Sequence, residues 1–315
     1  QLRAALAHSP DLAACFLKLH RAFMATNDQL MSVASSGETG QRVLPQTSEA
    51  VVHNFFRSNR NHFEALEQAA EGFWFGENVA PDDIYPALKL RLRHRMDLRV
   101  RLVPVAEMPT SLREYDEERR EVRLSEALDH PNRVFQLVHV AALVEQKDLL
   151  DDILGRSGLT DAKGRARCRV ELANYFAAAV LMPYEHFLTE ALESKYDFDH
   201  LATRFGVSFE QACHRATTLQ RSGARGVPFF FLRVDRAGNV TKRFNATGFT
   251  LAEEGGACPV WDLHGAFRVP GLIVPQFVEL PDGGQFFTIS RTTDRPVFSR
   301  QTQDRRLVVT IGCTR

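Results

Sequence analysis

His139 stands where a metal ligand would lie in a helix of the His-Glu-x-x-His pattern. In that pattern, two imidazoles on one helix face bind zinc and the glutamate acts as a general base. Here Val140 occupies the glutamate position and Leu143 that of the second histidine. One imidazole without a carboxylate can neither assemble zinc nor activate water. We therefore expect His139 to be a hydrogen-bonded core histidine, and we assign no catalytic residue.

The cysteines are the other residues that could bind a metal. Cys258 comes shortly after the glycine pair 255–256 and directly before a proline, and Cys313 follows a glycine, so the backbone there could approach a metal closely. Three thiolates can hold an iron–sulfur cluster, and we take the set as Cys213, Cys258 and Cys313, with either His214 or a residue beyond Arg315 as the candidate fourth ligand. The alternative is three small buried side chains. Helical apolar spacing already explains Cys15 and Cys168.

The charge balance argues against a nucleic-acid surface that extends over the whole chain. The 39 lysines and arginines equal the 39 aspartates and glutamates among 315 residues, so any DNA-binding part is local or lies outside this chain. No apolar run approaches the roughly 20 residues of a membrane span, and no signal peptide is visible. Five cysteines without tight spacing favour a reducing, cytoplasmic compartment.

The elements that would position these residues are mainly helical up to residue 222. Apolar spacing predicts helices over residues 12–33, 49–73 and 81–96, and later over 132–154 and 165–182. Between them, residues 98–105 alternate as a strand and residues 111–125 form a short hairpin. From Gly226 onward the composition changes to strands separated by turn residues, over residues 227–235, 239–244, 277–291 and 307–312.

Residues 201–220 are similar to a helix-turn-helix, with Gly206 in the turn. Reading a DNA groove requires several exposed polar and basic side chains. The second helix carries one basic residue, Arg215. We therefore interpret this pair of helices as a packing element.

Short motifs in the second half of the chain carry the most specific signal. The run Glu171-Leu172-Ala173-Asn174-Tyr175-Phe176-Ala177, with Met182-Pro183 after it, resembles the segment that carries the third ligand of ImmA/IrrE-type metallopeptidases. Further motifs resemble the short-chain fatty acyl-CoA regulator family, namely Cys213-His214-Arg215, Leu219-Gln220-Arg221, residues 223–235, Arg236-Ala237-Gly238-Asn239, Thr241-Lys242-Arg243, residues 255–261 and Pro281-Asp282-Gly283.

The resemblance implies an α+β architecture in three parts. We expect a helical linker or dimerisation region over residues 1–75, a degenerate peptidase-like α/β domain over 76–222, and a mainly β sensor domain over 223–315 that is truncated at its end. Members of the family have an N-terminal Xre helix-turn-helix, which we expect to precede this chain. Members also carry a 4Fe–4S centre, which strengthens the case for the three cysteines.

Coenzyme A defines the chemistry that a binding site must supply. Its phosphates favour arginine and lysine, its adenine stacks on aromatic or guanidinium groups, and its acyl–pantetheine arm needs an apolar slot. The predicted cofactor-binding residues are therefore Arg169, Tyr175, Arg221, Arg225, Phe230, Arg233, Lys242 and Arg243. Residues 229–231 alternate faces on a strand, so one face is expected in the core and the other could line a pocket. Each charged residue could instead be a solvated surface group.

The leading hypothesis is the effector-binding region of a bacterial transcriptional regulator. It would bind short-chain acyl-CoA of the propionyl or acetyl type, control the genes of its assimilation, act as a homodimer, and reach operator DNA through a domain outside this chain. One alternative is an iron–sulfur redox sensor. The other is an active zinc metallopeptidase, which Val140 and Leu143 disfavour.

Overall fold

The computed structural model describes residues 48–74, 83–109, 111–247, 249, 261–279, 283–294 and 306–315, with isolated helical positions between residues 15 and 26. Residues 47–315 form one compact unit and residues 1–46 another. All the elements whose bounds follow lie in the larger unit.

Helices make up most of the described chain before residue 217. In chain order they are α3 (Ser48–Ser58), α4 (Glu64–Glu71), α5 (Ile84–Met96), α6 (His130–Glu145), α7 (Lys147–Gly155), α8 (Ala162–Leu181), α9 (Tyr184–Glu193), α10 (Phe198–Phe205) and α11 (Phe209–Ala216).

Local capping chemistry defines the helices that matter for the site. The Asp129 side chain accepts from the backbone N–H of Asn132 at the start of α6, and Asp161 caps α8 in the same way. Ser208 forms a capping box at the start of α11. Such caps satisfy backbone N–H groups that lack a partner within the helix.

Two of the helices predicted from apolar spacing are each divided in two. The stretch 49–73 breaks between α3 and α4, where Arg60 and Asn61 adopt positive φ angles of 54° and 53°. The stretch 132–154 breaks at Gln146, between α6 and α7. Apolar spacing continues across both breaks, because both halves bury their apolar faces in the same core.

A small sheet lies beside the helices. It contains β1 (Arg99–Val103), β2 (Arg113–Asp116) and β3 (Glu121–Ser125) in the order β1-β3-β2. The pair β2–β3 is antiparallel and confirms the predicted hairpin, whereas β1 pairs with β3 in parallel.

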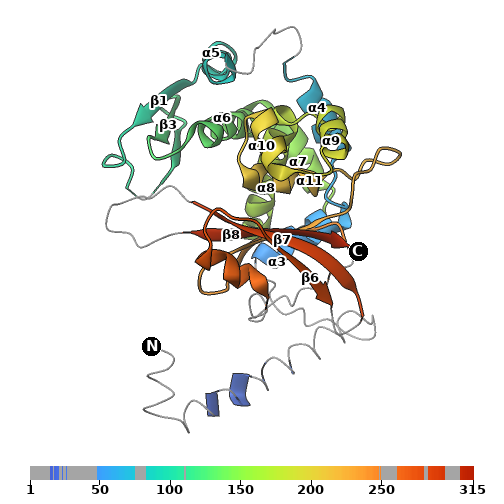
Figure 1. Cartoon of the computed structure of the whole chain (residues 1–315). Helices are drawn as coiled ribbons and strands as arrows, with labels where there is room; N and C mark the ends of the chain where they lie inside the picture. The colour runs from blue at the N-terminus through green and yellow to red at the C-terminus, as the bar shows by residue number, and fades with distance from the viewer. Residues whose placement is uncertain are drawn as a thin grey trace. The chain divides into compact units, whose positions relative to one another are not determined.

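The second sheet is antiparallel and lies after residue 229. Its strands are β4 (Phe230–Val234), β5 (Val240–Asn245), β6 (Val274–Glu279), β7 (Gln285–Thr293) and β8 (Leu307–Thr314), in the order β5-β4-β8-β7-β6. Figure 1 shows this sheet, in orange and red, against the green and yellow helices. The predicted α+β fold class is thereby confirmed.

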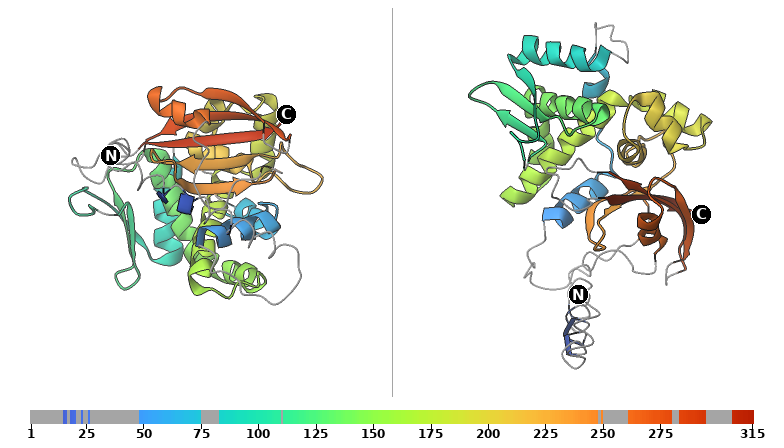
Figure 2. Two further views of the ribbon diagram at one scale, coloured as in Figure 1. Left: turned by 90° about the horizontal axis from the view of Figure 1, so that it is seen from below. Right: turned by 60° about the vertical axis from the view of Figure 1, so that its left-hand side comes forward.

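Both faces of the second sheet are covered. Phe231 and Ile311 belong to the large core shared with the helices, whereas Phe230 and Leu232 belong to a second core under the 3-10 helix η2 (Asp262–Arg268). Figure 2 shows η2 against the curved sheet. Successive residues of a strand point to opposite faces, so both faces of this strand pack into apolar core.

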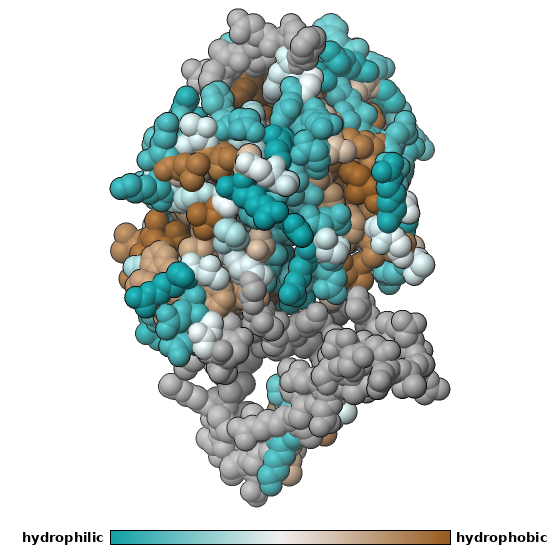
Figure 3. Space-filling view, turned by 90° about the vertical axis from the view of Figure 1, so that its right-hand side faces the viewer, coloured by the Kyte–Doolittle hydropathy of each residue, from teal (hydrophilic) through white to brown (hydrophobic). Residues whose placement is uncertain are grey.

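The described surface carries both polar and apolar side chains. On the face drawn in Figure 3, hydrophobic side chains gather in separate patches between hydrophilic ones. Exposed large apolar residues of the described part include Leu192, Leu272 and Phe277. No described helix has the length and apolar character needed to cross a bilayer.

Candidate functional site

His139 lies in a chain of polar contacts between α6 and α8. Its Nδ1 is 2.8 Å from Oδ1 of Asn174, and the Asn174 amide donates to Glu171 at 3.0 Å. The base and second-histidine positions of the degenerate motif remain apolar, because Val140 is fully buried and Leu143 packs against the same core. His139 is therefore the buried, hydrogen-bonded histidine that the sequence predicts.

The sheet contributes a cation to this vestigial centre, which we define as His139, Asn174 and Glu171. Lys242 of β5 places Nζ 3.6 Å from Oε2 of Glu171. Burial opposes ionisation of Glu171, but the Lys242 ammonium and the Asn174 hydrogen bond hold the pKa of this carboxyl below its usual value. Burial, followed by the charge of Arg113, lowers the pKa of His139 to about 3, so its ring is neutral at pH 7.

A cavity of about 750 Å³ adjoins the vestigial centre, between the helices and the large sheet. Asn174 of the centre and Lys242, which pairs with Glu171, also belong to the cavity wall. Helix α11 contributes Glu210, Gln211 and His214 to the wall. The apolar part of the wall includes Leu112, Leu128 and Phe135, and the basic part consists of Arg233, Lys242, Arg291 and Arg306.

The basic residues of the cavity are held by carboxylates. Arg233 pairs with Glu210 at 2.7 Å, Arg306 lies 3.7 Å from Asp294, and Arg291 pairs with Asp199. The cavity is therefore lined by oriented cations in partly solvated pairs. Anionic groups of a ligand can compete for such cations by charge-assisted hydrogen bonds.

His214 differs from these cations because its Nε2 is buried and has no hydrogen-bond partner among the described residues. Burial, followed by the charge of Lys242, lowers the pKa of His214 well below its usual value. The ring packs 4.3 Å from the Phe244 ring and 6.1 Å from the Phe231 ring, measured between centroids. His214 is thus a neutral, fixed polar group in the cavity wall.

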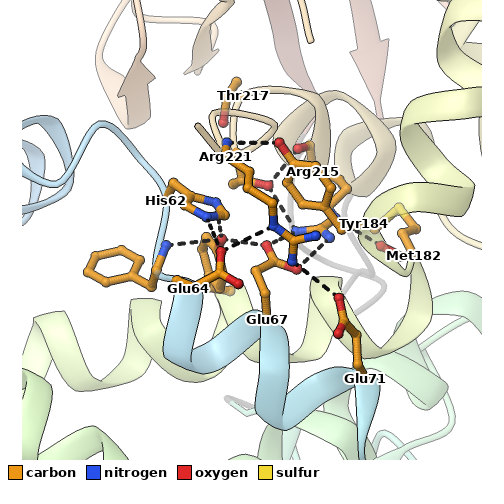
Figure 4. A network of polar contacts seen from close by, with 12 residues as sticks. His62, Glu64, Glu67, Glu71, Met182, Tyr184, Arg215, Thr217 and Arg221 are labelled. Atoms are coloured by element: carbon orange, nitrogen blue, oxygen red, sulfur yellow. Dashed lines mark hydrogen bonds and ion pairs between the residues drawn. The ribbon is translucent and has the colours of Figure 1, made fainter. Parts of the chain in front are cut away.

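The next residue of α11 points into a buried ion-pair network, drawn in Figure 4. The Arg215 guanidinium donates to both carboxylate oxygens of Glu67, at 2.7 and 2.9 Å, and to the Met182 carbonyl at 2.9 Å. The Tyr175 hydroxyl also donates to Glu67. Although burial opposes ionisation, Arg215 holds the pKa of Glu67 below its usual value.

The same residues explain the helix-turn-helix similarity. Gly206 ends α10 with a φ of 63°, and α11 follows directly. Six of the eight residues of α11 are buried, Arg215 completely. A helix enclosed in this way presents no surface to a DNA groove, so the structure supports the interpretation of this pair as a packing element.

Two predicted ligand residues, Arg233 and Lys242, line the cavity. Tyr175 and Phe230 are fully buried in protein contacts, with Glu67 and within the second core, respectively. Arg221 lies among surface carboxylates.

The remaining predicted ligand residues also lie away from the cavity wall. Arg169 pairs with Asp151 on the helical surface. Arg225 is exposed. Arg243 lies near His53, where burial and then the Arg243 charge lower the pKa of His53 to about 4. A ligand role for these residues stays a prediction.

Sequence reasoning missed Arg291 and Arg306 as cavity residues, and it considered His214 only as a metal ligand. Residues of β7 alternate between buried and more exposed positions. This pattern alone does not single out Arg291 as a ligand residue. Only the sheet order places both arginines near α11.

The predicted cluster ligands are partly described. Cys213 is fully buried, and burial, with the Glu210 charge, raises the pKa of its thiol well above the usual value. Cys313 is half-buried beside the same core. Gly312 has a packing role, because a Cβ there would lie 2.6 Å from the Phe230 ring. Cys258 lies outside the described residues.

These thiols do not by themselves form a metal site. Within the described residues, no three His, Cys, Asp or Glu groups converge as a metal would require. The iron–sulfur cluster therefore stays a prediction. An absorbance spectrum of anaerobically purified protein checks it, with loss of a brown colour in Cys213→Ser but not in Cys168→Ser as the expected result.

Comparison with known proteins places this architecture in a family. Residues 93–217 match the family described as "IrrE N-terminal-like domain", and residues 218–315 match "Short-chain fatty acyl coenzyme A regulator, C-terminal". Neither match tests the predicted three-part domain division, which stays a prediction.

Relatives of known structure or name cover almost the whole chain. The chain is 38% identical to a propionyl-CoA carboxylase regulator of Cereibacter sphaeroides, over 99% of this chain and 66% of that protein. It is 34% identical to the HTH-type transcriptional regulator PrpR of Mycobacterium tuberculosis, over 99% and 65%. The chain thus spans slightly less than two thirds of the length of these curated relatives.

A solved structure shows that the similarity extends to the fold. A Mycobacterium tuberculosis transcriptional regulator is 36% identical with a TM-score of 0.77, and the match covers 84% of this chain and 80% of that one. Sequence identity at this level, together with the shared fold, is sufficient to assign the chain to a family. The chain belongs to the short-chain fatty acyl coenzyme A regulator family.

Proposed function

We propose that this chain is the effector-binding part of a bacterial transcriptional regulator and that its effector is a short-chain acyl-CoA. The names of its relatives and the family match of residues 218–315 support this role. In this proposal the regulator is a cytoplasmic homodimer, and it contacts operator DNA through a domain other than the buried helix α11.

The cavity between the vestigial centre and the sheet is the observation that carries the proposal. Its volume of about 750 Å³ falls within the range of roughly 300–1,000 Å³ typical of small-molecule sites. Arg291 and Arg306 suit the phosphates of coenzyme A, and Leu128 and Phe135 suit an acyl arm. One wall therefore offers both kinds of contact that acyl-CoA requires.

We infer that the peptidase-like part binds a ligand and does not hydrolyse peptides. Peptide hydrolysis in this fold needs a general base and a second imidazole on α6, where Val140 and Leu143 stand. The Lys242 ammonium pairs with Glu171, the carboxylate of the third-ligand segment. A cation held at that carboxylate opposes the binding of a second, divalent cation there by like-charge repulsion.

Calorimetry against acetyl-CoA, propionyl-CoA, longer acyl-CoAs and free coenzyme A tests the proposal. We expect the tightest binding for a short acyl chain. Replacing Arg291 or Arg306 with alanine is expected to raise the Kd about tenfold, since one lost charge-assisted contact is worth about 1.4 kcal/mol or more.

Arg204→Ala is the matched control, because Arg204 also belongs to a partly exposed ion pair, with Glu190, but lies outside the cavity wall. It is expected to leave the Kd unchanged. Absence of binding of every acyl-CoA by the unaltered protein, folded by circular dichroism, would refute the proposed function.

A further inference from the structure

The basic residues of the cavity wall carry no surplus charge for a polyanionic ligand. Each arginine and lysine of the described wall has a carboxylate partner within the described part of the chain. The pairs are Arg233 with Glu210, Lys242 with Glu171, Arg291 with Asp199, and Arg306 with Asp294. The phosphates of coenzyme A are negatively charged, so these carboxylates repel the ligand that the cations attract. Binding is therefore stronger if some of the pairs open.

Three of these pairs join the large sheet to helices, and they differ in how easily they could open. The Glu171 side chain is only 6% exposed, and a buried carboxylate without its countercharge is costly. The side chains of Asp199 and Glu210 are 56% and 21% exposed, so water can solvate either carboxylate. Both residues also lie in the first turn of a helix, α10 and α11 respectively, where the helix dipole stabilises a negative charge. The pairs of Asp199 and Glu210 therefore open at a lower cost than that of Glu171.

The arginines of these two pairs are available to a ligand. Both line the cavity, and both side chains are partly exposed. Arg233 donates from Nε to the Thr241 hydroxyl and from Nη1 to Glu210, and Arg291 donates from Nη1 to Asp199. A phosphate forms charge-assisted and often bidentate hydrogen bonds with a guanidinium, as a carboxylate does. A phosphate in the cavity can therefore compete with either carboxylate for its arginine.

The same two pairs hold one end of the helices α10 and α11 to the sheet. Arg233 lies in β4 and Arg291 in β7, so the pairs connect the first turns of both helices to two strands. The other end of α11 is anchored independently, because Arg215 in its last turn pairs with the buried carboxylate of Glu67. Opening the two pairs would release the first turns and leave that anchor in place.

We propose that Asp199 and Glu210 compete with the phosphates of the effector, and that the effector releases α10 and α11 from the sheet when it binds Arg291 and Arg233. This inference rests on the proposed function and assigns a means of regulation to the same site. Ligand binding is coupled to a change in the protein, because each arginine pairs either with its helix or with the ligand. The two carboxylates also lower the affinity, and so they set the effector concentration at which the protein responds.

Calorimetry with propionyl-CoA on the full chain tests the competition. Asp199→Asn and Glu210→Gln each remove a competing charge and keep the size of the side chain. We expect each change to lower the Kd about threefold, and the two together to lower it about tenfold. Circular dichroism checks the fold of each variant. Asp199→Asn alters an exposed side chain, so it tests the proposal even if Glu210→Gln does not fold.

Glu190→Gln is the matched control. It removes the same charge, and Glu190 also pairs with a residue of α10, Arg204, at 3.3 Å, but it lies on α9 and outside the cavity wall. It should leave the Kd unchanged. A Kd that stays the same or rises in Asp199→Asn or in folded Glu210→Gln overturns the inference, because the carboxylates would then only orient the arginines. Failure of the unaltered protein to bind any acyl-CoA overturns the proposed function itself.

Hydrogen exchange tests the release of the helices. Propionyl-CoA should make the backbone amides of α10 exchange faster in the unaltered protein, whereas a ligand that only covers a surface slows exchange there. The double variant Asp199→Asn with Glu210→Gln should show the faster exchange without ligand, because its ionic contacts with the sheet are already lost. Unchanged or slower exchange of α10 on binding of propionyl-CoA overturns the proposed release and leaves the proposed function standing.

Discussion

Two adjacent residues of α11 belong to opposite kinds of environment. Arg215 is completely buried, and its donors reach Glu67, Met182 and Thr218. His214 is also buried, but its Nε2 has no partner among the described residues. A satisfied buried network holds a helix in one place, whereas a buried group without a partner contributes no hydrogen bond that fixes the helix. The comparison separates the side of α11 that stabilises the fold from the side that we expect to bind.

Removing the Arg215 guanidinium should produce the largest effect. In Arg215→Ala, the Glu67 carboxylate remains buried without its countercharge, which costs about 3–5 kcal/mol. Urea denaturation measures the free energy of unfolding. The double variant Arg215→Met with Glu67→Leu should recover most of the loss, because no unpaired charge remains. A loss below about 1 kcal/mol in Arg215→Ala would contradict a structural role for this side of α11.

Acid should lower the stability of the folded protein, because histidines on the cavity side are neutral in the folded state. The pKa of His139 is lowered from 6.5 to about 3, so below pH 6.5 the unfolded chain binds a proton that the folded chain does not. Stability is therefore full above pH 6.5 and falls as the pH approaches 3. From this histidine alone we expect a loss of about 2 kcal/mol between pH 7.5 and 5.

Urea denaturation at these two pH values measures that loss. His139→Gln should reduce the difference between the two measurements by about the same amount, because glutamine does not titrate. An unchanged pH dependence in His139→Gln would show that His139 is protonated in the folded protein as readily as in the unfolded chain.

The smallest effect is expected at Arg221, despite its many partners. Arg221 contacts Glu64, Glu71 and Glu185 at 3.0–3.2 Å, but these carboxylates are about half exposed or more. Solvent screens such pairs, and exposed ion pairs are worth about 0–1 kcal/mol each. Arg221→Ala should therefore lower the free energy of unfolding far less than Arg215→Ala, with part of the loss due to its contact with the Tyr184 ring. Equal losses of unfolding free energy in Arg221→Ala and Arg215→Ala would contradict the distinction between buried and exposed ion pairs.

The sequence alone determined the local features of this protein. Apolar periodicity predicts α8 and the strands of the large sheet because helices and strands repeat over a few residues. The change from a metal-binding helix to an apolar one is likewise visible in Val140 and Leu143. Capping residues such as Ser208 act within three positions of themselves, so local sequence contains their effect.

Only the tertiary structure decided which side chains meet. Arg215 and Glu67 are 148 residues apart in the chain, and Tyr175 reaches Glu67 from a distance of 108 residues. Phe230 had the residue type expected of a pocket, but η2 covers its face of the sheet. Of the predicted ligand residues, Arg233 and Lys242 reach the cavity because β4 and β5 pair beside α11. Such partner choices depend on how whole elements pack, and no short-range periodicity contains that information.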